Sequence, residues 1–369
     1  MTGKRFFLAL IASASATFLC VLTASSFYLY HISIERKTPD LLSQNLKLAQ
    51  TFEGQAVSVL AAPELPAAEH LEISNSELFE DSDSDLIETN NSGLFGTSDS
   101  DHVELSGPGW VESQPYDTWT ITSGDGLALV GYYIPARMPT TKTVILAHGY
   151  GGRGMEMGQF AKFYWEKLGY NVLLPDARGH GASEGAYIGF GWPDRKDYLL
   201  WIQKIIDWVG YDSQIALHGL SMGGATVMMA SGETLPEQVK VIVEDSGYTS
   251  VYDEFAYQLK RIYKLPAFPL IPATSLLTDI RAGYHFSEAS SLKQVAKNKT
   301  PMLFIHGVLD TIVPTEMALK LYDACNAEKE LYLAENAGHG MAFYANQPLY
   351  EKIVTNFVDR YIYSPPAIY

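Results

Sequence analysis

The residues best suited to chemistry lie in the stretch 217–224, which has the sequence LHGLSMGG. Ser221 lies between Gly219 and Gly223 in the pattern G-x-S-x-G, after an apolar run and before a helix-like run. Glycine is costly inside regular structure, so glycines around one serine indicate a sharp bend or a close approach of the backbone. Between a strand and a helix, this pattern is typical of a turn that presents the serine hydroxyl as a nucleophile.

A serine hydroxyl is a weak nucleophile near neutral pH and needs a base, which in turn needs an acid to orient it. Where a strand, a sharp turn and a helix carry the serine, the acid and then the histidine follow it along the chain. Asp310 in FIHGVLDTIVP and His339 in ENAGHGMAF fit that order, each just past an expected strand. We therefore predict Ser221, Asp310 and His339 as a catalytic triad, with Asp245 as the alternative acid.

The reaction also needs N–H groups that point at the substrate oxygen when it becomes charged. HGYGGRG, residues 148–154, directly follows an expected strand. We predict that the backbone N–H groups of Tyr150 and Met222 form this oxyanion hole. Three other histidines that precede a glycine at a strand end are interpreted as structural: His148, His218 and His306. The polar cluster of PDARGHGASEG is interpreted as fixing a loop: Asp176, Arg178 and His180.

The elements around these residues alternate between strands and helices after a first hairpin, DTWTIT and LALVGYYI. Helices are expected over residues 155–168, 194–209, 314–325 and 347–361. Alternation of this kind implies crossover connections and a mainly parallel sheet with helices on both faces. Because carboxyl ends of parallel strands meet at one sheet edge, we expect the three predicted catalytic residues to lie together there.

Residues 246–300 interrupt the alternation and are predicted to form a small inserted cap. The cap is rich in aromatic and apolar residues, and small-ligand sites are mostly apolar. We predict that Tyr248, Phe268 and Leu270 bind substrate. The alternative is that such side chains only pack the cap onto the core. Glu254 is the cap's candidate for binding a free amine.

The first 34 residues are predicted to form a membrane anchor. Residues 6–30 contain no charged side chain, and this run is long enough for a helix to cross a bilayer. Lys4 and Arg5 precede the run, which favours an extracytoplasmic body. The alternative is a signal peptide cleaved near residues 24–26, which would give a secreted protein.

Residues 35–109 are predicted to form an acidic, low-complexity linker. The formal net charge is −16, and no Lys or Arg occurs between Lys47 and Arg137. The segment contains a degenerate repeat, SELFEDSDSD over 76–85 and SGLFGTSDSD over 92–101. The alternative is that the alternating acids of residues 81–85 bind calcium, but this segment lacks the glycine and the glutamate of a calcium-binding loop. No basic cluster indicates nucleic acid as a partner.

HGYGG, PDARGHGASEG, GLSMGG, FIHGVLDTIVP and AGHG together resemble the serine α/β-hydrolases. Over about 110–361, and in the predicted anchor, the chain is similar to membrane-anchored cell-surface hydrolases of Gram-positive bacteria, which are related to serine aminopeptidase-like and lysophospholipase-like enzymes. The resemblance implies an α/β-hydrolase domain over residues 110–369, with the triad and oxyanion donors predicted above. It implies no substrate, because one such fold hosts many reactions.

These features predict a serine hydrolase that cleaves acyl esters through an acyl-enzyme on Ser221 at the cell surface. Its expected partners are a small-molecule or lipid-like acyl substrate and, through the N-terminal helix, the membrane. We expect neither a cofactor nor a metal ion. A peptidase or aminopeptidase would use the same triad and is the main alternative, and a non-catalytic surface binding protein is the third.

Overall fold

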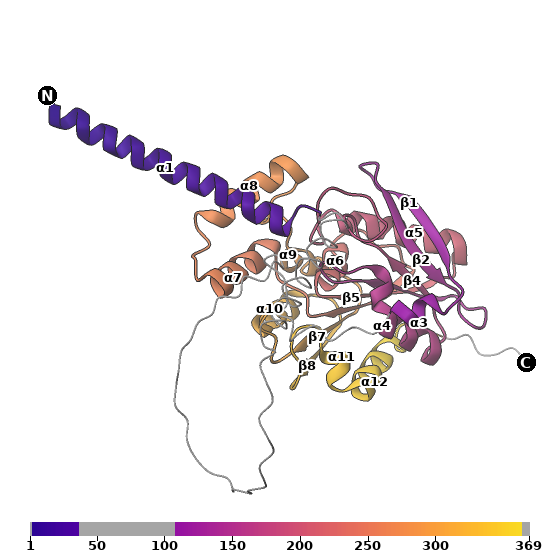
Figure 1. Ribbon diagram of the computed structural model, residues 1–369. Coiled ribbons are helices and arrows are strands. Elements are labelled where there is room, and N and C mark those ends of the chain that lie inside the picture. Colours follow the sequence, from indigo (N-terminus) through magenta and orange to yellow (C-terminus); the bar gives the residue numbers. More distant parts are fainter. Residues whose placement is uncertain (1, 37–107, 364–369) are drawn as a thin grey trace, which may run out of the picture. The chain divides into compact units, whose positions relative to one another are not determined.

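A computed structural model describes residues 2–36 and 108–363, and their side chains from residue 15 onward, apart from residues 16 and 108 (Figure 1). The strands are β1 (Asp117–Thr122), β2 (Ala128–Ile134), β3 (Lys142–Ala147), β4 (Asn171–Pro175), β5 (Gln214–Leu220), β6 (Val239–Asp245), β7 (Met302–Gly307) and β8 (Lys329–Ala334). The helices are α1 (Thr2–Ser33), α3 (Pro108–Glu112), η1 (Gly154–Met157), α4 (Gly158–Lys162), η2 (Phe163–Lys167), α5 (Asp194–Val209), α6 (Met222–Ala230), α7 (Val251–Tyr263), α8 (Leu270–Ala282), α9 (Ser291–Val295), α10 (Thr315–Ala324), α11 (Ala342–Ala345) and α12 (Gln347–Val358). The predicted linker and its repeat fall almost wholly on residues 37–107, outside the described residues.

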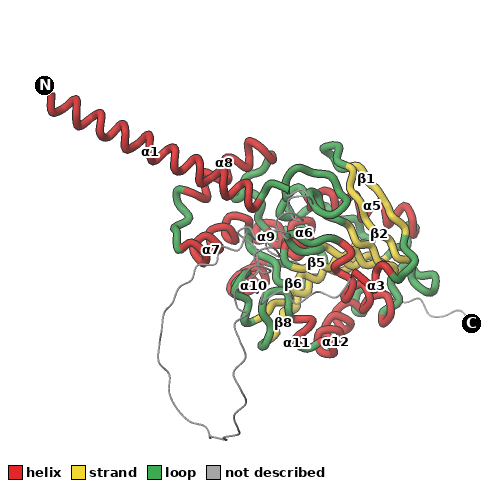
Figure 2. Tube along the Cα trace, in the orientation of Figure 1, coloured by secondary structure: helices red, strands yellow, loops and turns green. Residues whose placement is uncertain are grey.

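One eight-stranded sheet runs through the domain in the order β1-β2-β4-β3-β5-β6-β7-β8. Its strands are drawn in yellow in Figure 2. The pairs β1–β2 and β2–β4 are antiparallel, and every other pair is parallel. The predicted hairpin and the mainly parallel sheet are therefore confirmed. The strand order and the helical connections are those of the α/β-hydrolase fold.

Helices cover both faces of the sheet. Each strand packs against both layers, because successive residues along a strand point to opposite faces. In β3, Val144 and Leu146 belong to an apolar cluster that includes Phe357 of α12. The residue between them, Ile145, belongs to a different cluster, which includes Trp201 of α5. The central strands are buried on both sides, as their almost wholly apolar sequences require.

The parallel register brings the loops that carry chemistry to one edge of the sheet. Ala147 at the end of β3 is opposite Gly219 of β5, and Leu220 is opposite Asp245 of β6. Asp245 is in turn opposite Ile305 of β7. The loops that follow these strands therefore leave the sheet side by side.

The expected helix over 155–168 is wrong as a single element. The chain instead forms a 3₁₀ turn, a five-residue α-helix and a π-helical turn. Phe163, Tyr164 and Trp165 are consecutive and all buried. A straight amphipathic helix buries one stripe and cannot place three successive residues in the core, which accounts for the widened turn.

The last turns of α1 belong to the same structural unit as the hydrolase domain. Tyr30 and Ile34 are buried in an apolar cluster with cap residues. The N–H of Ile188 donates to the carbonyl of Ile34 at 2.7 Å, and the N–H of Arg36 donates to the carbonyl of Ala186 at 3.0 Å. This part of the chain is therefore built into the domain.

The predicted membrane-spanning run, residues 6–30, falls partly on residues 6–14, whose side chains lie outside those described. Within the described part of the chain, the structure contains no helix with both the length and the apolar character needed to cross a membrane. It gives no support to the predicted anchor.

The segment between β6 and β7 contains helices α7, α8 and α9. Helix α7 is fastened to the loop that follows β7. The side-chain amide of Gln258 donates to the carbonyl of Ile312 at 2.8 Å, and the hydroxyl of Tyr257 donates to the carbonyl of Thr311 at 2.9 Å. The cap thus lies at the sheet edge to which the loops converge.

Candidate active site

Ser221 occupies the turn between β5 and α6 in a strained conformation, with φ of 57° and ψ of −116°. The two flanking glycines are required by close packing. A Cβ on Gly219 would lie 2.1 Å from the carbonyl oxygen of Gly223, and one on Gly223 would lie 2.0 Å from the carbonyl oxygen of Ala147. The glycines therefore let the helix start against the strand ends and hold the serine at the sheet edge.

The structure brings the three predicted catalytic residues into one hydrogen-bonded chain. Ser221 Oγ lies 2.7 Å from His339 Nε2, and His339 Nδ1 lies 2.7 Å from Asp310 Oδ2. The other oxygen of Asp310 accepts the N–H groups of Ile312 and Val313, each at 2.9 Å. With Nδ1–H donated to Asp310, the lone pair on Nε2 faces the serine hydroxyl, as a general base requires.

The charges of Asp310 and His339 stabilise one another. Burial by itself would raise the pKa of Asp310, but the adjacent His339 and His306 together hold that pKa well below its ordinary value. Burial by itself would lower the pKa of His339, but the charge and the hydrogen bond of Asp310 raise it above the ordinary value. Asp310 is therefore a carboxylate, and His339 becomes a stabilised cation when it takes a proton.

His306 is a second histidine beside Asp310, and interpreting it only as a structural residue missed this contact. Its Nε2 lies 2.8 Å from the carbonyl oxygen of Val313 and 3.2 Å from Asp310 Oδ2, so Nε2 carries the proton. Burial lowers the pKa of His306, but Asp310 outweighs burial and raises it. The signal in the sequence is the spacing H-x-x-x-D at the end of a strand.

Asp245, the alternative acid, does not contact His339. Its carboxylate accepts the hydroxyl of Ser246 at 2.8 Å and the hydroxyl of Tyr350 at 2.9 Å. Burial raises the pKa of Asp245 to about 6. The histidine is therefore oriented by Asp310, and Asp245 belongs to the packing behind the nucleophile turn.

The two predicted oxyanion donors flank the serine. Met222 is the first residue of α6, where an N–H has no acceptor within the helix. On the other side, a Cβ on Gly149 would lie 3.5 Å from the Cβ of Ser221, so the loop that carries Tyr150 borders the nucleophile. The Tyr150 hydroxyl donates to the carbonyl of Ser33 at 3.2 Å, which ties this loop to the end of α1.

The loop 148–154 is braced by the polar cluster after β4. The N–H of Ala177 donates to His148 at 3.0 Å, and the N–H of Gly151 donates to His180 at 3.2 Å. Asp176 accepts the N–H of Gly154 at 2.7 Å. Burial lowers the pKa of His180 to about 3, so this ring is neutral and its Nε2 can accept the hydrogen bond from Gly151. These bonds agree with the interpretation of the cluster as fixing a loop.

His218 lies in the core between two hydroxyls. Its ring nitrogens lie 3.2 Å from the hydroxyl of Tyr164 and 3.1 Å from that of Tyr350. Burial lowers the pKa of His218 to about 3. This agrees with its interpretation as a structural residue.

The three predicted substrate-binding residues have different surroundings. Tyr248 is buried, and its hydroxyl donates to the carbonyl of Phe190 at 3.0 Å. Leu270 is partly buried against the apolar cluster of the cap. Phe268 is 75% exposed, so its side chain faces solvent and does not line an enclosed acyl site. The packing alternative fits Tyr248 best.

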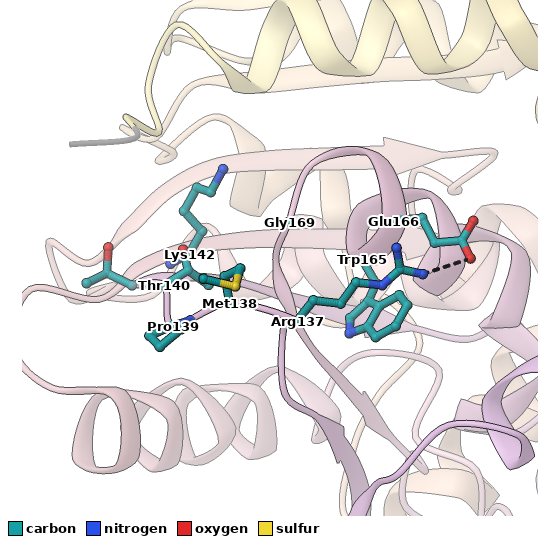
Figure 3. A pocket seen from close by; sticks show the side chains of 9 residues that line it. Arg137, Met138, Pro139, Thr140, Lys142, Trp165, Glu166 and Gly169 are labelled. Carbon is teal, nitrogen blue, oxygen red and sulfur yellow. Dashed lines mark hydrogen bonds and ion pairs between the residues drawn. The ribbon is translucent and has the colours of Figure 1, made fainter. Parts of the chain in front are cut away.

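A cavity of about 620 Å³ lies at the start of β3, at the end of that strand opposite to the catalytic residues. Figure 3 shows the side chains that line it. It is lined by Arg137, Met138, Pro139, Thr140, Thr141, Lys142, Trp165, Glu166 and Gly169. Lys142 begins β3, whereas the loop beside Ser221 follows the end of that strand. The guanidinium of Arg137 lies 4.2 Å from the ring centre of Trp165 and 3.5 Å from Glu166. This cavity is therefore separate from the catalytic residues.

Among solved structures, the Pyrococcus furiosus esterase Pf2001 is similar to this chain, with a TM-score of 0.56 and 26% identity. The similarity covers 68% of this chain and 93% of the esterase chain. The acylaminoacyl peptidase of Pyrococcus horikoshii has a TM-score of 0.52 and 18% identity over 70% of this chain and 44% of its own, which shows a shared fold. The uncharacterized protein YqkD of Bacillus subtilis is 29% identical over 249 residues, which cover 68% of this chain and 81% of that protein.

The family model of the prolyl oligopeptidase family matches residues 158–364. This match covers more than half of the chain, and it includes Ser221, Asp310 and His339. The fold of this chain and the solved structures similar to it are those of serine hydrolases of the α/β-hydrolase superfamily. The chain therefore belongs to the prolyl oligopeptidase family and is a serine hydrolase.

Proposed function

We propose that this protein hydrolyses carboxylic esters of uncharged acyl groups, with Ser221, His339 and Asp310 as its catalytic triad. The observation that carries the proposal is the continuous chain of two 2.7 Å contacts from Ser221 Oγ through His339 to Asp310. The base has both the hydroxyl whose proton it takes, on Ser221, and its orienting acid, Asp310, in place, which completes a triad for acyl transfer.

In the proposed reaction, Ser221 Oγ attacks the acyl carbonyl while His339 Nε2 takes the hydroxyl proton. The oxygen that becomes negative is held by the N–H groups of Tyr150 and Met222. The tetrahedral intermediate collapses, and the alcohol leaves with the proton from His339. A water molecule then gives a proton to His339, attacks the acyl-enzyme and releases the acid, and the proton returns to Ser221.

The surroundings of Glu254 favour esters over substrates with a free amino group. Glu254 is buried in α7, and one of its oxygens accepts the side-chain amide of Gln258 at 2.7 Å. Burial raises the pKa of Glu254 to about 8, so it is protonated at neutral pH and offers no carboxylate to an amine. Val308 and Leu309, next to Asp310, are exposed and apolar, which suits an uncharged acyl chain.

Peptide-bond hydrolysis is the second candidate, and the match to the prolyl oligopeptidase family favours it. The two reactions share the triad and differ only in the leaving group. A panel of acyl esters and aminoacyl amides, assayed with the purified protein, separates them. A higher kcat/KM for the amides than for every ester would replace the proposed esterase activity with a peptidase activity.

Covalent labelling by a fluorophosphonate tests whether the serine is reactive at all. The wild-type protein should be labelled, and Ser221→Ala should not. Ser246 provides a matched control, because it also has a positive φ and lies at the same sheet edge. Loss of labelling in Ser221→Ala but not in Ser246→Ala supports the assignment, and an unlabelled wild type would favour a non-catalytic binding protein.

We also propose that the hydrolase domain faces the extracytoplasmic side, attached by residues 1–34. The uncharged run 6–30 and the preceding Lys4 and Arg5 support this orientation. Protease treatment of intact cells tests it: the domain should be degraded while a cytoplasmic marker survives. Recovery of a domain that begins near residues 24–26 from the medium would favour the cleaved signal peptide instead.

A further inference from the structure

The end of α7 and the link to α8 expose a run of apolar side chains. Residues 260–268 have the sequence KRIYKLPAF. Within it, the large apolar residues that are exposed are Ile262, Tyr263, Leu265 and Phe268. Leu276 and Ile280, one turn apart on α8, are also exposed, Ile280 at 72%. We call residues 260–268 with Leu276 and Ile280 the cap surface. Apolar groups of this size that gather on one surface mark an interaction site.

The charges of the cap surface are all of one sign. Lys260, Arg261 and Lys264 lie within residues 260–268, which contain no acid. Among the described residues, neither Lys260 nor Lys264 forms an ion pair. Asp279, the acid on α8 that lies near Ile280 in sequence, is 3.3 Å from His285. The net charge of the chain is −16, so the three cations of residues 260–268 are opposite in sign to the chain as a whole.

The apolar surface continues onto α1. The guanidinium of Arg281 in α8 lies 5.1 Å from the ring centre of Tyr30 and 6.0 Å from that of Phe27. Burial raises the pKa of Tyr263 at the end of α7, and the neighbouring Tyr28 of α1 raises it further. Further along α1, the exposed side chains include Phe18, Leu19 and Val21. One helix and two cap segments therefore present apolar side chains next to one another.

We propose that the cap surface docks on an anionic lipid bilayer. Exposed aromatic and aliphatic side chains insert at the boundary between headgroups and acyl chains, and cations beside them are attracted to anionic headgroups. A second copy of the chain fits less well. In a symmetric dimer the same patch faces itself, so Lys260, Arg261 and Lys264 would face the identical cations.

Docking at this surface would place the bilayer close to the catalytic residues. Helix α7 leads directly into the cap surface, and it is bonded to the carbonyls of Thr311 and Ile312 in the loop that carries Asp310. The esterase would then take acyl groups from lipids, a consequence that rests on the proposed function. The docking itself can be measured without any substrate.

The experiment uses the full chain in vesicles, so that α1 is the same in every sample. Phe268→Trp places a fluorophore on the cap surface. Met138→Trp is the matched control, because Met138 is 74% exposed and lines the cavity at the opposite strand ends. Vesicles of phosphatidylcholine and phosphatidylglycerol are prepared with brominated acyl chains, which quench only tryptophans at bilayer depth. The contribution of the six native tryptophans is subtracted with the wild-type chain.

In the Phe268→Trp variant, the emission of the introduced tryptophan should shift to the blue and be quenched at least about twofold more than that of the Met138→Trp control. Equal quenching in the two variants would overturn the proposal. A blue shift of the cap fluorophore that appears without vesicles and grows with protein concentration would also overturn it, because a second copy would then cover the surface. The melting temperature of each variant establishes that it is folded.

The charge requirement is tested on the Phe268→Trp background. Lys260→Glu with Lys264→Glu should remove at least half of the additional quenching, and so should vesicles of phosphatidylcholine alone. Lys297→Glu with Lys299→Glu, an exposed pair outside the cap surface, should leave it unchanged. Hydrolysis of a soluble butyryl ester should stay within about twofold in both double variants. The proposal would be overturned if the additional quenching were unchanged both by Lys260→Glu with Lys264→Glu and by vesicles of phosphatidylcholine alone.

Discussion

Nε2 of His306 lies 3.2 Å from Oδ2 of Asp310, the carboxylate oxygen that also lies 2.7 Å from His339. His306 lies within β7 and Asp310 follows four residues later, so their pairing is local in the chain. His339 reaches the same oxygen from the loop after β8. The acid of the proposed triad is therefore held by a buried histidine from its own strand as well as by the catalytic histidine.

His306→Asn should lower kcat/KM by about 10- to 100-fold, because a hydrogen bond to a buried charge contributes about 1.5–3 kcal/mol. It also removes a group that lowers the pKa of Asp310, so the carboxylate should interact more strongly with His339, and the acid limb of the pH profile should move to higher pH. Kinetics from pH 5 to 9 measure both effects.

His285→Asn is the control for that substitution. His285 is exposed and 3.3 Å from Asp279, away from the triad, so its loss should change kcat/KM by less than about twofold. A folded His306→Asn protein with wild-type kcat/KM and an unmoved acid limb would show that His306 does not position Asp310.

Ser221→Ala should lower kcat for ester hydrolysis by on the order of three or more decades. Its melting temperature should stay close to the wild-type value, since the methyl group fits the space of the hydroxymethyl group and disturbs no packing. Steady-state kinetics and thermal unfolding measure the two quantities. Retention of more than about a tenth of the activity would exclude Ser221 as the nucleophile.

The pH dependence of kcat/KM should follow His339. The imidazole must be neutral to accept the proton of Ser221, and Asp310 raises its pKa above the ordinary value of 6.5. Activity should therefore be full above the raised pKa and should fall as the pH drops through it, with a midpoint above about 6.5. A profile that is flat from pH 5 to 8 would contradict the assignment of His339 as base.

Ile34→Ala should destabilise the hydrolase domain by about 2–4 kcal/mol, as is usual when a buried isoleucine is truncated. Ile34 is fully buried, although it belongs to the last residues of the N-terminal segment. Thr23→Ala, at an exposed position on α1, should have little effect. Denaturant unfolding compares the two variants, and equal stabilities would mean that the end of α1 is not part of the domain core.

The sequence by itself determined the catalytic edge. Ser221, Asp310 and His339 each follow an apolar run, and alternation with helices implied a parallel sheet. In such a sheet the carboxyl ends of strands lie together whatever the details of packing. The glycines at 219 and 223 likewise predicted a tight turn, because only a residue without a Cβ allows that approach of helix and strand.

The tertiary structure decided what depends on side-chain direction and on contacts between distant segments. Asp245 ends β6 and Asp310 follows β7, yet only Asp310 faces His339, because Asp245 turns to Ser246 and Tyr350. Phe268 is apolar by type but exposed, and Ile34 lies next to charged residues in sequence but is buried. Hydrophobic periodicity describes one element at a time, whereas burial is set by which elements pack together in space.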